Sequence, residues 1–129
     1  MTENKNDKKR ILLVEDEKDM VYAVTLQLED KGYEVIVASD GKEGLDKART
    51  KKPDLIILDL MLPKLDGYKV CRMLKFDNKY KDIPIILFTA RAQDSDKKIG
   101  KEVGADAYIT KPFEPRVLLD KIRRLLDLP

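Results

Sequence analysis

Histidine and tryptophan are both absent from the sequence, and cysteine occurs only once, at Cys71. Without histidine, and with a single thiol, the chain lacks the nitrogen and sulfur ligands on which zinc and copper sites depend. One cysteine also cannot close an internal disulfide, which is typical of proteins from a reducing cytoplasm. The sequence therefore argues against a transition-metal centre of this type and against a disulfide-stabilised secreted fold.

Long hydrophobic runs are also lacking. The charged N-terminal stretch MTENKNDKKR is followed by the apolar run ILLV, which is too short for a signal sequence or a membrane span. We predict a flexible, charged tail over residues 1–9. We also predict no association with membranes and a cytoplasmic location.

The sequence also lacks a large excess of positive or of negative charge. Lys and Arg total 26 and Asp and Glu total 24, so a charged fraction of 39% leaves a net charge of only +2. No dense basic stretch interleaved with aromatic residues appears, although such a stretch is the usual sign of a nucleic-acid-binding surface. The sequence predicts no direct nucleic-acid binding by this chain.

What the sequence does have is a series of short runs rich in Val, Ile and Leu. They are ILLV at 11–14, EVIVA at 34–38, LIIL at 55–58, PIILFTA at 84–90 and AYIT at 107–110. Such runs are typical of strands that are covered on both faces, and segments of helical period separate them. Strand and helix alternate five times in a chain long enough for one domain. This pattern predicts a single α/β domain with a parallel sheet and right-handed crossovers.

Local signals indicate where the predicted helices begin and end. Gly32 stops the first helix, and Asp66 is a candidate N-cap for the third. The helix at 93–105 has the weakest pattern because it is polar and interrupted by a glycine, whereas residues 115–128 have the strongest. The third helix is expected to carry three apolar residues on one side: Val70, Met73 and Leu74.

Four of the five predicted strands end in a charged residue or a threonine. The first strand leads into Glu15 and Asp16, the third into Asp59, the fourth into Thr89 and the fifth into Lys111. Open parallel sheets bind their ligands beyond the carboxyl ends of the strands. Each residue alone has an ordinary structural explanation, such as a helix cap or a turn. Their convergence at one edge predicts a functional site.

Three carboxylates at one edge repel each other unless a cation lies between them. An all-oxygen set suits Mg²⁺, for which Mn²⁺ can substitute. A carboxylate beside such an ion can attack phosphorus and form an acyl phosphate. Lys111 could then neutralise one phosphoryl oxygen while Thr89 donates a hydrogen bond to another.

The chain resembles the receiver domain of bacterial two-component response regulators from about Arg10 to Leu126. The resemblance is carried by LLVEDE, DLIILDLMLPKLDG, PIILFTA, GADAYITKPF and the closing amphipathic segment, in family order and spacing. It implies a flavodoxin-like (CheY-like) three-layer sandwich with sheet order 2-1-3-4-5 and five helices. It also implies a receiver domain over residues 10–127, with no effector domain in this chain.

The same resemblance implies roles for the acidic residues and one neighbour. Asp59 matches the phosphoacceptor, Asp16 the direct metal ligand, and Glu15 the acid that reaches the metal through water. Met61 matches the residue whose backbone carbonyl completes the protein ligands.

The remaining roles concern switching and the lifetime of the phosphoryl group. Thr89 matches the switch hydroxyl, Tyr108 the switch aromatic, and Lys111 the phosphate-binding lysine, whose bond to the following proline is typically cis. Met61 and Arg91 occupy positions that tune lifetime in this family, and both would obstruct an attacking water. The resemblance thus implies a signalling protein, not an enzyme, that assists its own phosphorylation and autodephosphorylates slowly.

The expected partners are a sensor histidine kinase or phosphotransfer protein upstream, and a protein target or a homodimer downstream. The motifs look most like receivers that precede a winged-helix DNA-binding domain, which dimerise through the fourth helix, fifth strand and fifth helix. Lys97 and Lys121 are plausible bases on that face, but Ala107 and Val117 stand where the partner acids are expected. This puts such a dimer in doubt.

Three interpretations remain open from the sequence. The first is a stand-alone receiver that signals to another protein, and the second is the receiver part of a DNA-binding regulator. The third is a phosphatase of the haloacid-dehalogenase type, which also uses Mg²⁺ and an aspartyl phosphate. That class needs an acid two residues after the nucleophile, where this chain has Met61.

Overall fold

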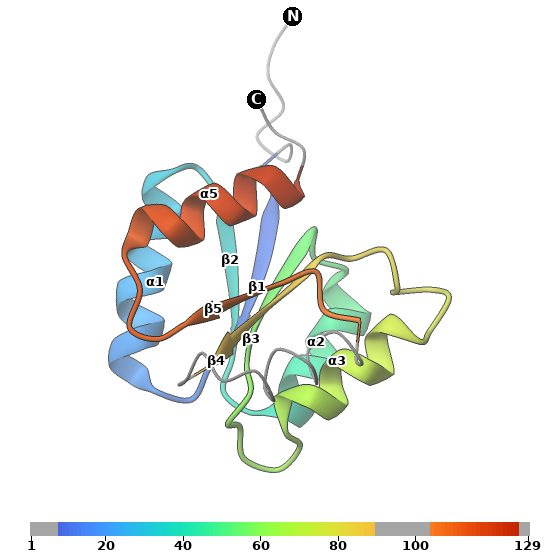
Figure 1. Cartoon of the computed structure of the whole chain (residues 1–129). Coiled ribbons are helices and arrows are strands. Elements are labelled where there is room, and N and C mark those ends of the chain that lie inside the picture. Colours follow the sequence, from blue (N-terminus) through green and yellow to red (C-terminus); the bar gives the residue numbers. More distant parts are fainter. Residues whose placement is uncertain (1–7, 90–103, 127–129) are drawn as a thin grey trace, which may run out of the picture.

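The computed structural model describes residues 8–89 and 104–126 and shows five strands in one parallel sheet of order β2-β1-β3-β4-β5 (Figure 1). The strands are β1 (Arg10–Val14), β2 (Glu34–Ala38), β3 (Leu55–Asp59), β4 (Ile85–Thr89) and β5 (Ala107–Thr110). The helices are α1 (Lys18–Asp30), α2 (Gly41–Lys51), α3 (Gly67–Lys75) and α5 (Pro115–Leu125). The predicted strand order and the flavodoxin-like architecture are confirmed. The helix predicted at 93–105 falls almost wholly outside the described residues, as do most of the predicted tail and the last residues of the chain.

The helices cover the two faces of the sheet in pairs, with α1 and α5 on one side and α2 and α3 on the other (Figure 1). Neighbouring residues of β1 point to opposite faces: Leu13 packs with α1 and α5, whereas Leu12 packs with α2 and α3. Both residues are fully buried. This is why the strand sequences are continuously apolar rather than alternating.

The predicted helix signals agree with the observed ends. Gly32 follows α1 with a positive φ of 89°, a conformation that glycine adopts at little cost. The side chain of Asp66 accepts a hydrogen bond from the backbone N–H of Lys69 and so caps α3. One expectation for α3 was wrong: Met73 is 43% exposed, and Cys71 is buried with Val70 in its place.

None of the described helices is long and apolar enough to cross a membrane. In the described part of the chain, each of the four helices follows a strand of the sheet and begins near the carboxyl end of that strand. The carboxyl edge of the sheet is where the polar residues following β1, β3, β4 and β5 come together.

Candidate functional site

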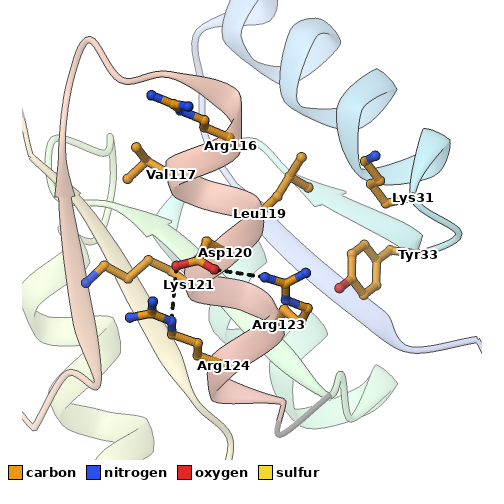
Figure 2. Close-up of a pocket in the computed structure, with 9 residues that line it drawn as sticks. All are labelled: Lys31, Tyr33, Arg116, Val117, Leu119, Asp120, Lys121, Arg123 and Arg124. Atoms are coloured by element: carbon orange, nitrogen blue, oxygen red, sulfur yellow. Dashed lines mark hydrogen bonds and ion pairs between the residues drawn. The ribbon is translucent and has the colours of Figure 1, made fainter. Parts of the chain in front are cut away.

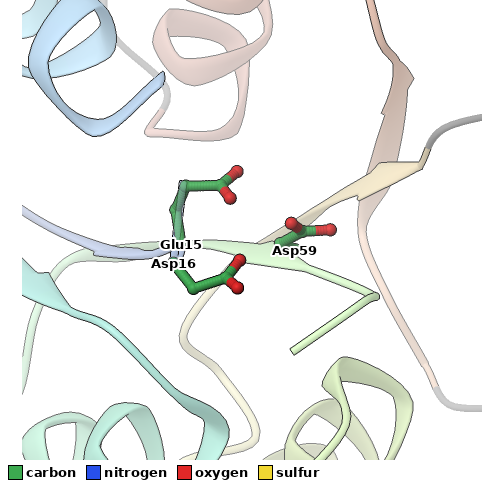
Figure 3. Close-up of side chains that lie close together, drawn as sticks. All are labelled: Glu15, Asp16 and Asp59. Atoms are coloured by element: carbon green, nitrogen blue, oxygen red, sulfur yellow. The ribbon is translucent and has the colours of Figure 1, made fainter. Parts of the chain in front are cut away.

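Three carboxylates meet where β1 and β3 end (Figure 3). Val14 and Leu58 are partners in the β1–β3 register, so the next residues, Glu15 and Asp59, emerge side by side. One oxygen from each of Glu15, Asp16 and Asp59 lies within 4.8 Å of the others. Glu15 and Asp59 are buried, whereas Asp16 is exposed, so the cluster opens to solvent on the Asp16 side.

The ammonium group of Lys111, the residue that follows β5, joins this cluster. Its Nζ lies 2.8 Å from Oε1 of Glu15 and 3.2 Å from Oδ2 of Asp59. The peptide bond from Lys111 to Pro112 is cis. The backbone N–H of Lys111 donates to the carbonyl oxygen of Thr89 at 2.7 Å and so holds this residue beside the end of β4. A residue 52 positions away from Asp59 in sequence is thereby held against its carboxylate.

The cluster is short of positive charge even with the lysine in place. Burial raises the pKa of Glu15 from 4.5 to about 7, and the nearby charge of Asp59 adds to this effect, although the hydrogen bond from Lys111 opposes it. For Lys111, burial alone would lower the pKa, but its hydrogen bond to Glu15 and the charge of Asp59 raise it above the ordinary value. A further cation bound beside these carboxylates would therefore stabilise their ionised forms.

The donor set fits a hard divalent cation. All three side chains offer carboxylate oxygens, and the exposed Asp16 leaves one side open for water or a ligand. Met61 lies in the loop after β3 and is 77% exposed, and its N–H donates to Oδ1 of Asp59 at 3.1 Å. The loop backbone therefore lies directly beside the acidic cluster, as the proposed use of the Met61 carbonyl requires.

The other predicted residues are placed as follows. Thr89 is the last residue of β4 and is buried at the same sheet edge. Tyr108 is partly buried in β5 and packs against the core cluster beneath α2 and α3. Arg91 and Lys97 lie outside the described residues.

One contact of the site could not be found from the sequence. The Nζ of Lys111 lies 5.6 Å from the centre of the Phe88 ring, which itself packs against the ring of Phe113 at 5.0 Å. An aromatic ring at this distance attracts a cation and also shields it from water. Phe88 gave no sequence signal because it lies within an apolar strand run.

A concavity of about 690 Å³ runs along α5, and none of the three clustered acids lines it (Figure 2). Its lining includes Val117 and Lys121, which were expected on the dimer face. Asp120 pairs with two arginines of its own helix, Arg123 at 3.0 Å and Arg124 at 3.1 Å. This acid is therefore already engaged within the helix, and the lining as a whole is basic.

Comparison with known proteins identifies a matching family and two similar relatives. The family model of the response regulator receiver domain matches residues 11–123. The alkaline phosphatase synthesis transcriptional regulatory protein PhoP of Bacillus subtilis is 49% identical over 118 residues, which is 92% of this chain and 48% of that protein. The DNA-binding dual master transcriptional regulator RpaA of Synechocystis sp. is 45% identical over 117 residues, again 48% of its length. The chain thus spans about half the length of these relatives.

Solved structures agree with the family match. A putative response regulator from Chloroflexus aurantiacus superposes with a TM-score of 0.90 at 35% identity, covering 94% of this chain and 99% of that one. The receiver domain of the sensor histidine kinase PA1611 from Pseudomonas aeruginosa, with a magnesium ion in its active-site cleft, gives 0.86 at 31% identity, covering 93% and 98%. Fold, acidic edge and sequence all agree: the chain belongs to the response regulator receiver domain family.

Proposed function

We propose that this chain accepts a phosphoryl group on Asp59, in a Mg²⁺-dependent reaction with a phosphohistidine of a sensor kinase or with a small phosphodonor. The observation that carries the proposal is the contact of Lys111 with both Glu15 and Asp59 beside the exposed Asp16. In this proposal Asp59 is the nucleophile, and the ammonium group of Lys111 and two further acids lie around it at the open end of the sheet.

In the proposed reaction an oxygen of Asp59 attacks phosphorus, and the bond from phosphorus to the donor breaks. With a phosphohistidine donor, the ring nitrogen leaves with the bonding electrons and an acyl phosphate remains on Asp59. Lys111 already contacts Oδ2 of Asp59 at 3.2 Å, so its ammonium is in place to neutralise a phosphoryl oxygen. The N–H of Met61 holds the other oxygen, Oδ1, and thereby fixes the orientation of the carboxylate.

The metal ligands in this proposal are Asp16 and Asp59 directly, Glu15 through water, and the backbone carbonyl of Met61. Mg²⁺ bound there supplies charge neutralisation for the phosphoryl oxygens, and Mn²⁺ can replace it. The four residues lie on two strand ends and one short loop, so the sheet supplies most of their rigidity.

The signal, in this proposal, passes through Thr89 and Tyr108. A phosphoryl group adds roughly −1.5 to −2 charges and three acceptor oxygens. Thr89 moves to donate to one of these oxygens, and Tyr108 turns inward to fill the space beside it, which shifts a pre-existing equilibrium between two states. The surface proposed to change comprises β5, α5 and the helix predicted at 93–105.

The acyl phosphate is proposed to be long-lived because Met61 and Arg91 obstruct the attacking water. The chain then acts as a signalling protein that assists its own phosphorylation and slow dephosphorylation, and no external substrate is turned over. A phosphoryl half-life of seconds in Mg²⁺ would contradict this. The haloacid-dehalogenase alternative is disfavoured by Met61, which offers no general acid.

Intact-mass analysis with Mg²⁺ and acetyl phosphate tests the phosphoacceptor directly. We expect the native chain to gain one phosphoryl group, and a chelator to prevent the gain. Asp59→Asn should gain nothing, whereas Asp82→Asn, which removes an exposed carboxylate elsewhere, should behave as the native chain does. An unchanged gain in Asp59→Asn would refute the assignment.

The output has two candidates. A stand-alone receiver would dock a partner protein, whereas a receiver within a longer regulator would control DNA binding through a phosphorylation-dependent dimer. The second is favoured by the relatives, which are transcriptional regulators about twice the length of the matched region. A coding sequence that continues beyond Pro129 into a helix-turn-helix pattern would establish it.

Light scattering in Mg²⁺, with and without beryllofluoride as a phosphoryl mimic, separates the two outputs for this chain. A shift from monomer to dimer supports the dimer-driven output despite Ala107 and Val117. A monomer in both states, with binding of the mimic confirmed by NMR, supports docking to a different protein. Either output is proposed for the cytoplasm, where a soluble phosphodonor or the kinase domain of a sensor would reach the site.

A further inference from the structure

The loop after β3, residues 60–66, carries the backbone of Met61 past the acidic cluster, and its two ends are firmly anchored. At its start, the N–H of Leu60 donates to the carbonyl of Phe88 at 3.2 Å. At its end, the N–H of Gly67 donates to the carbonyl of Leu60, also at 3.2 Å. These hydrogen bonds fix the two ends of the loop, and the position of its middle depends on other contacts.

The middle of the loop rests on the beginning of α2. The N–H of Gly41 donates to the carbonyl of Pro63 at 3.3 Å. Lys64, which has a positive φ of 68°, places its Nζ 3.5 Å from Oδ2 of Asp40, the N-cap residue of α2. The capping interaction, from Glu43 N–H to Asp40 at 2.8 Å, ties that residue to the helix. The loop thus contacts α2 through one backbone hydrogen bond and one ion pair.

Gly41 is buried at the centre of this contact, and it has no room for a side chain. A Cβ at this position would lie 1.6 Å from the carbonyl oxygen of Leu65 and 2.6 Å from its carbonyl carbon. Both are backbone atoms, so no rotation of a side chain relieves the clash. Among the described residues, the glycines with positive φ are Gly32 and Gly104, so Gly41 is required for space and not for its backbone conformation.

We infer that Gly41 is a positioning residue for the phosphoacceptor site, an inference that rests on the proposed function. By allowing the loop to lie directly on α2, it sets where the Met61 backbone stands. That backbone donates to Oδ1 of Asp59 and, in the proposed function, offers a carbonyl to Mg²⁺. Gly41 touches neither the phosphoryl group nor the metal and acts through the loop.

The size of the effect follows from the geometry. Real Cβ atoms essentially never approach another heavy atom to within 3.0 Å, so an alanine at 41 must displace the loop or the helix by about 1.4 Å or more. A misplacement of about 1 Å can slow a reaction by roughly a hundredfold. For Gly41→Ala we expect weaker Mg²⁺ binding and phosphorylation by acetyl phosphate slowed by about ten- to a hundredfold.

Gly44→Ala is the matched control. It makes the same substitution in the same helix at another buried glycine, but the nearest atoms to its Cβ would be side-chain atoms of Val14: the two Cγ atoms at 2.7 and 2.9 Å and the Cβ at 3.4 Å. Val14 is a strand residue whose backbone is paired on both sides, and the atoms that a Cβ at position 44 would meet belong to its side chain and not to the loop at 60–66. Gly44→Ala therefore crowds the core beside β1 and leaves the loop at 60–66 untouched.

The first measurement is the backbone amide shift of Met61 in the metal-free proteins, followed by Mg²⁺ titration and the phosphorylation rate. We expect Gly41→Ala to move the Met61 resonance and to weaken Mg²⁺ binding, and Gly44→Ala to do neither. The inference is overturned if Gly41→Ala keeps the native shift and affinity, or if both variants lose affinity equally. A native chain that takes up no Mg²⁺ refutes the proposed function itself, whereas native binding retained in Gly41→Ala refutes the positioning role alone.

Hydrogen exchange of the native chain tests the inference without any substitution, which matters if Gly41→Ala fails to fold. Coupling between two sites is reciprocal, so a metal that orders the loop must also strengthen the Gly41–Pro63 hydrogen bond. We expect the Gly41 amide to exchange more slowly in Mg²⁺. The Gly44 amide, which is bonded to Asp40 within the helix at 2.9 Å, should not change. An unchanged Gly41 amide would overturn the inference.

Discussion

Glu15 should make the metal-free protein less stable as the pH rises, and Glu15→Gln should remove this dependence. The folded protein raises the pKa of Glu15 from 4.5 to about 7, mainly because the side chain is buried beside Asp59. Between these two values the unfolded chain has lost the proton and the folded chain still holds it. Since the folded state binds more protons there, its stability falls with increasing pH.

The magnitude follows from the two pKa values. From about pH 5 to about pH 8, a shift from 4.5 to about 7 lowers the free energy of unfolding by about 2–3 kcal/mol. Lys111 does not add to the slope, because its pKa is raised from 10.5 and it stays protonated in both states across this range. Its ion pair with Asp59 remains available in Glu15→Gln.

The assay is urea denaturation in a chelator, followed by far-ultraviolet circular dichroism because the chain has no tryptophan. The native chain should lose more stability between the two pH values than Glu15→Gln does, by about 2–3 kcal/mol. Glu17→Gln, which removes an exposed neighbouring carboxylate, should keep the native dependence. Parallel stability curves for the native chain and Glu15→Gln would show that Glu15 titrates normally, and the electrostatic account of the site would then be wrong.

Three further predictions concern the core. Leu74→Ala should lower the free energy of unfolding by about 2–5 kcal/mol because Leu74 is fully buried, whereas Met73→Ala should lower it by less than about 1 kcal/mol. Equal losses for the two variants in urea denaturation would contradict the observed orientation of α3. Lys75→Met should cost about 1–3 kcal/mol, because the carboxylate of Asp106, 2.6 Å from the lysine in the native chain, and two backbone carbonyls lose the ammonium group as a partner, although Asp106 still accepts a hydrogen bond from the N–H of Ile85; thermal and urea unfolding would measure this, and a native-like midpoint would refute it. Burial raises the pKa of the Cys71 thiol to about 12, so a thiol reagent should label it only at the rate of unfolding; rapid labelling of the folded protein would contradict this.

The strands could be predicted because their residue types are almost all apolar, as expected for strands that are buried on both faces. Apolar runs such as ILLV and LIIL have no polar face, and only a sheet covered on both sides can bury them. The rotation of α3 was not predictable in the same way. Val70 and Leu74 can share a buried side with either Cys71 or Met73 at helical spacing, and the contact with the sheet decides between them.

The acidic edge was predictable for a similar reason. Parallel strands deliver their last residues to one edge, so the sequence positions of Glu15, Asp59 and Lys111 sufficed to bring them together. Neither the contact between the lysine and both acids nor the raised pKa of Glu15 followed from the sequence. Both depend on distances of about 3 Å and on burial, which are properties of the packed structure.

The sequence by itself therefore determined the layered α/β fold, the family and the meeting of Glu15, Asp59 and Lys111 at one edge of the sheet, because each of these follows from residue type and order along the chain. Only the tertiary structure decided how the loop after Asp59 is held. Gly41 lies in a different helix, and nothing in its sequence neighbourhood points to the carbonyl of Leu65. Its role arises because two segments that are separate in sequence approach until their backbones touch, and such an approach exists only in the folded chain.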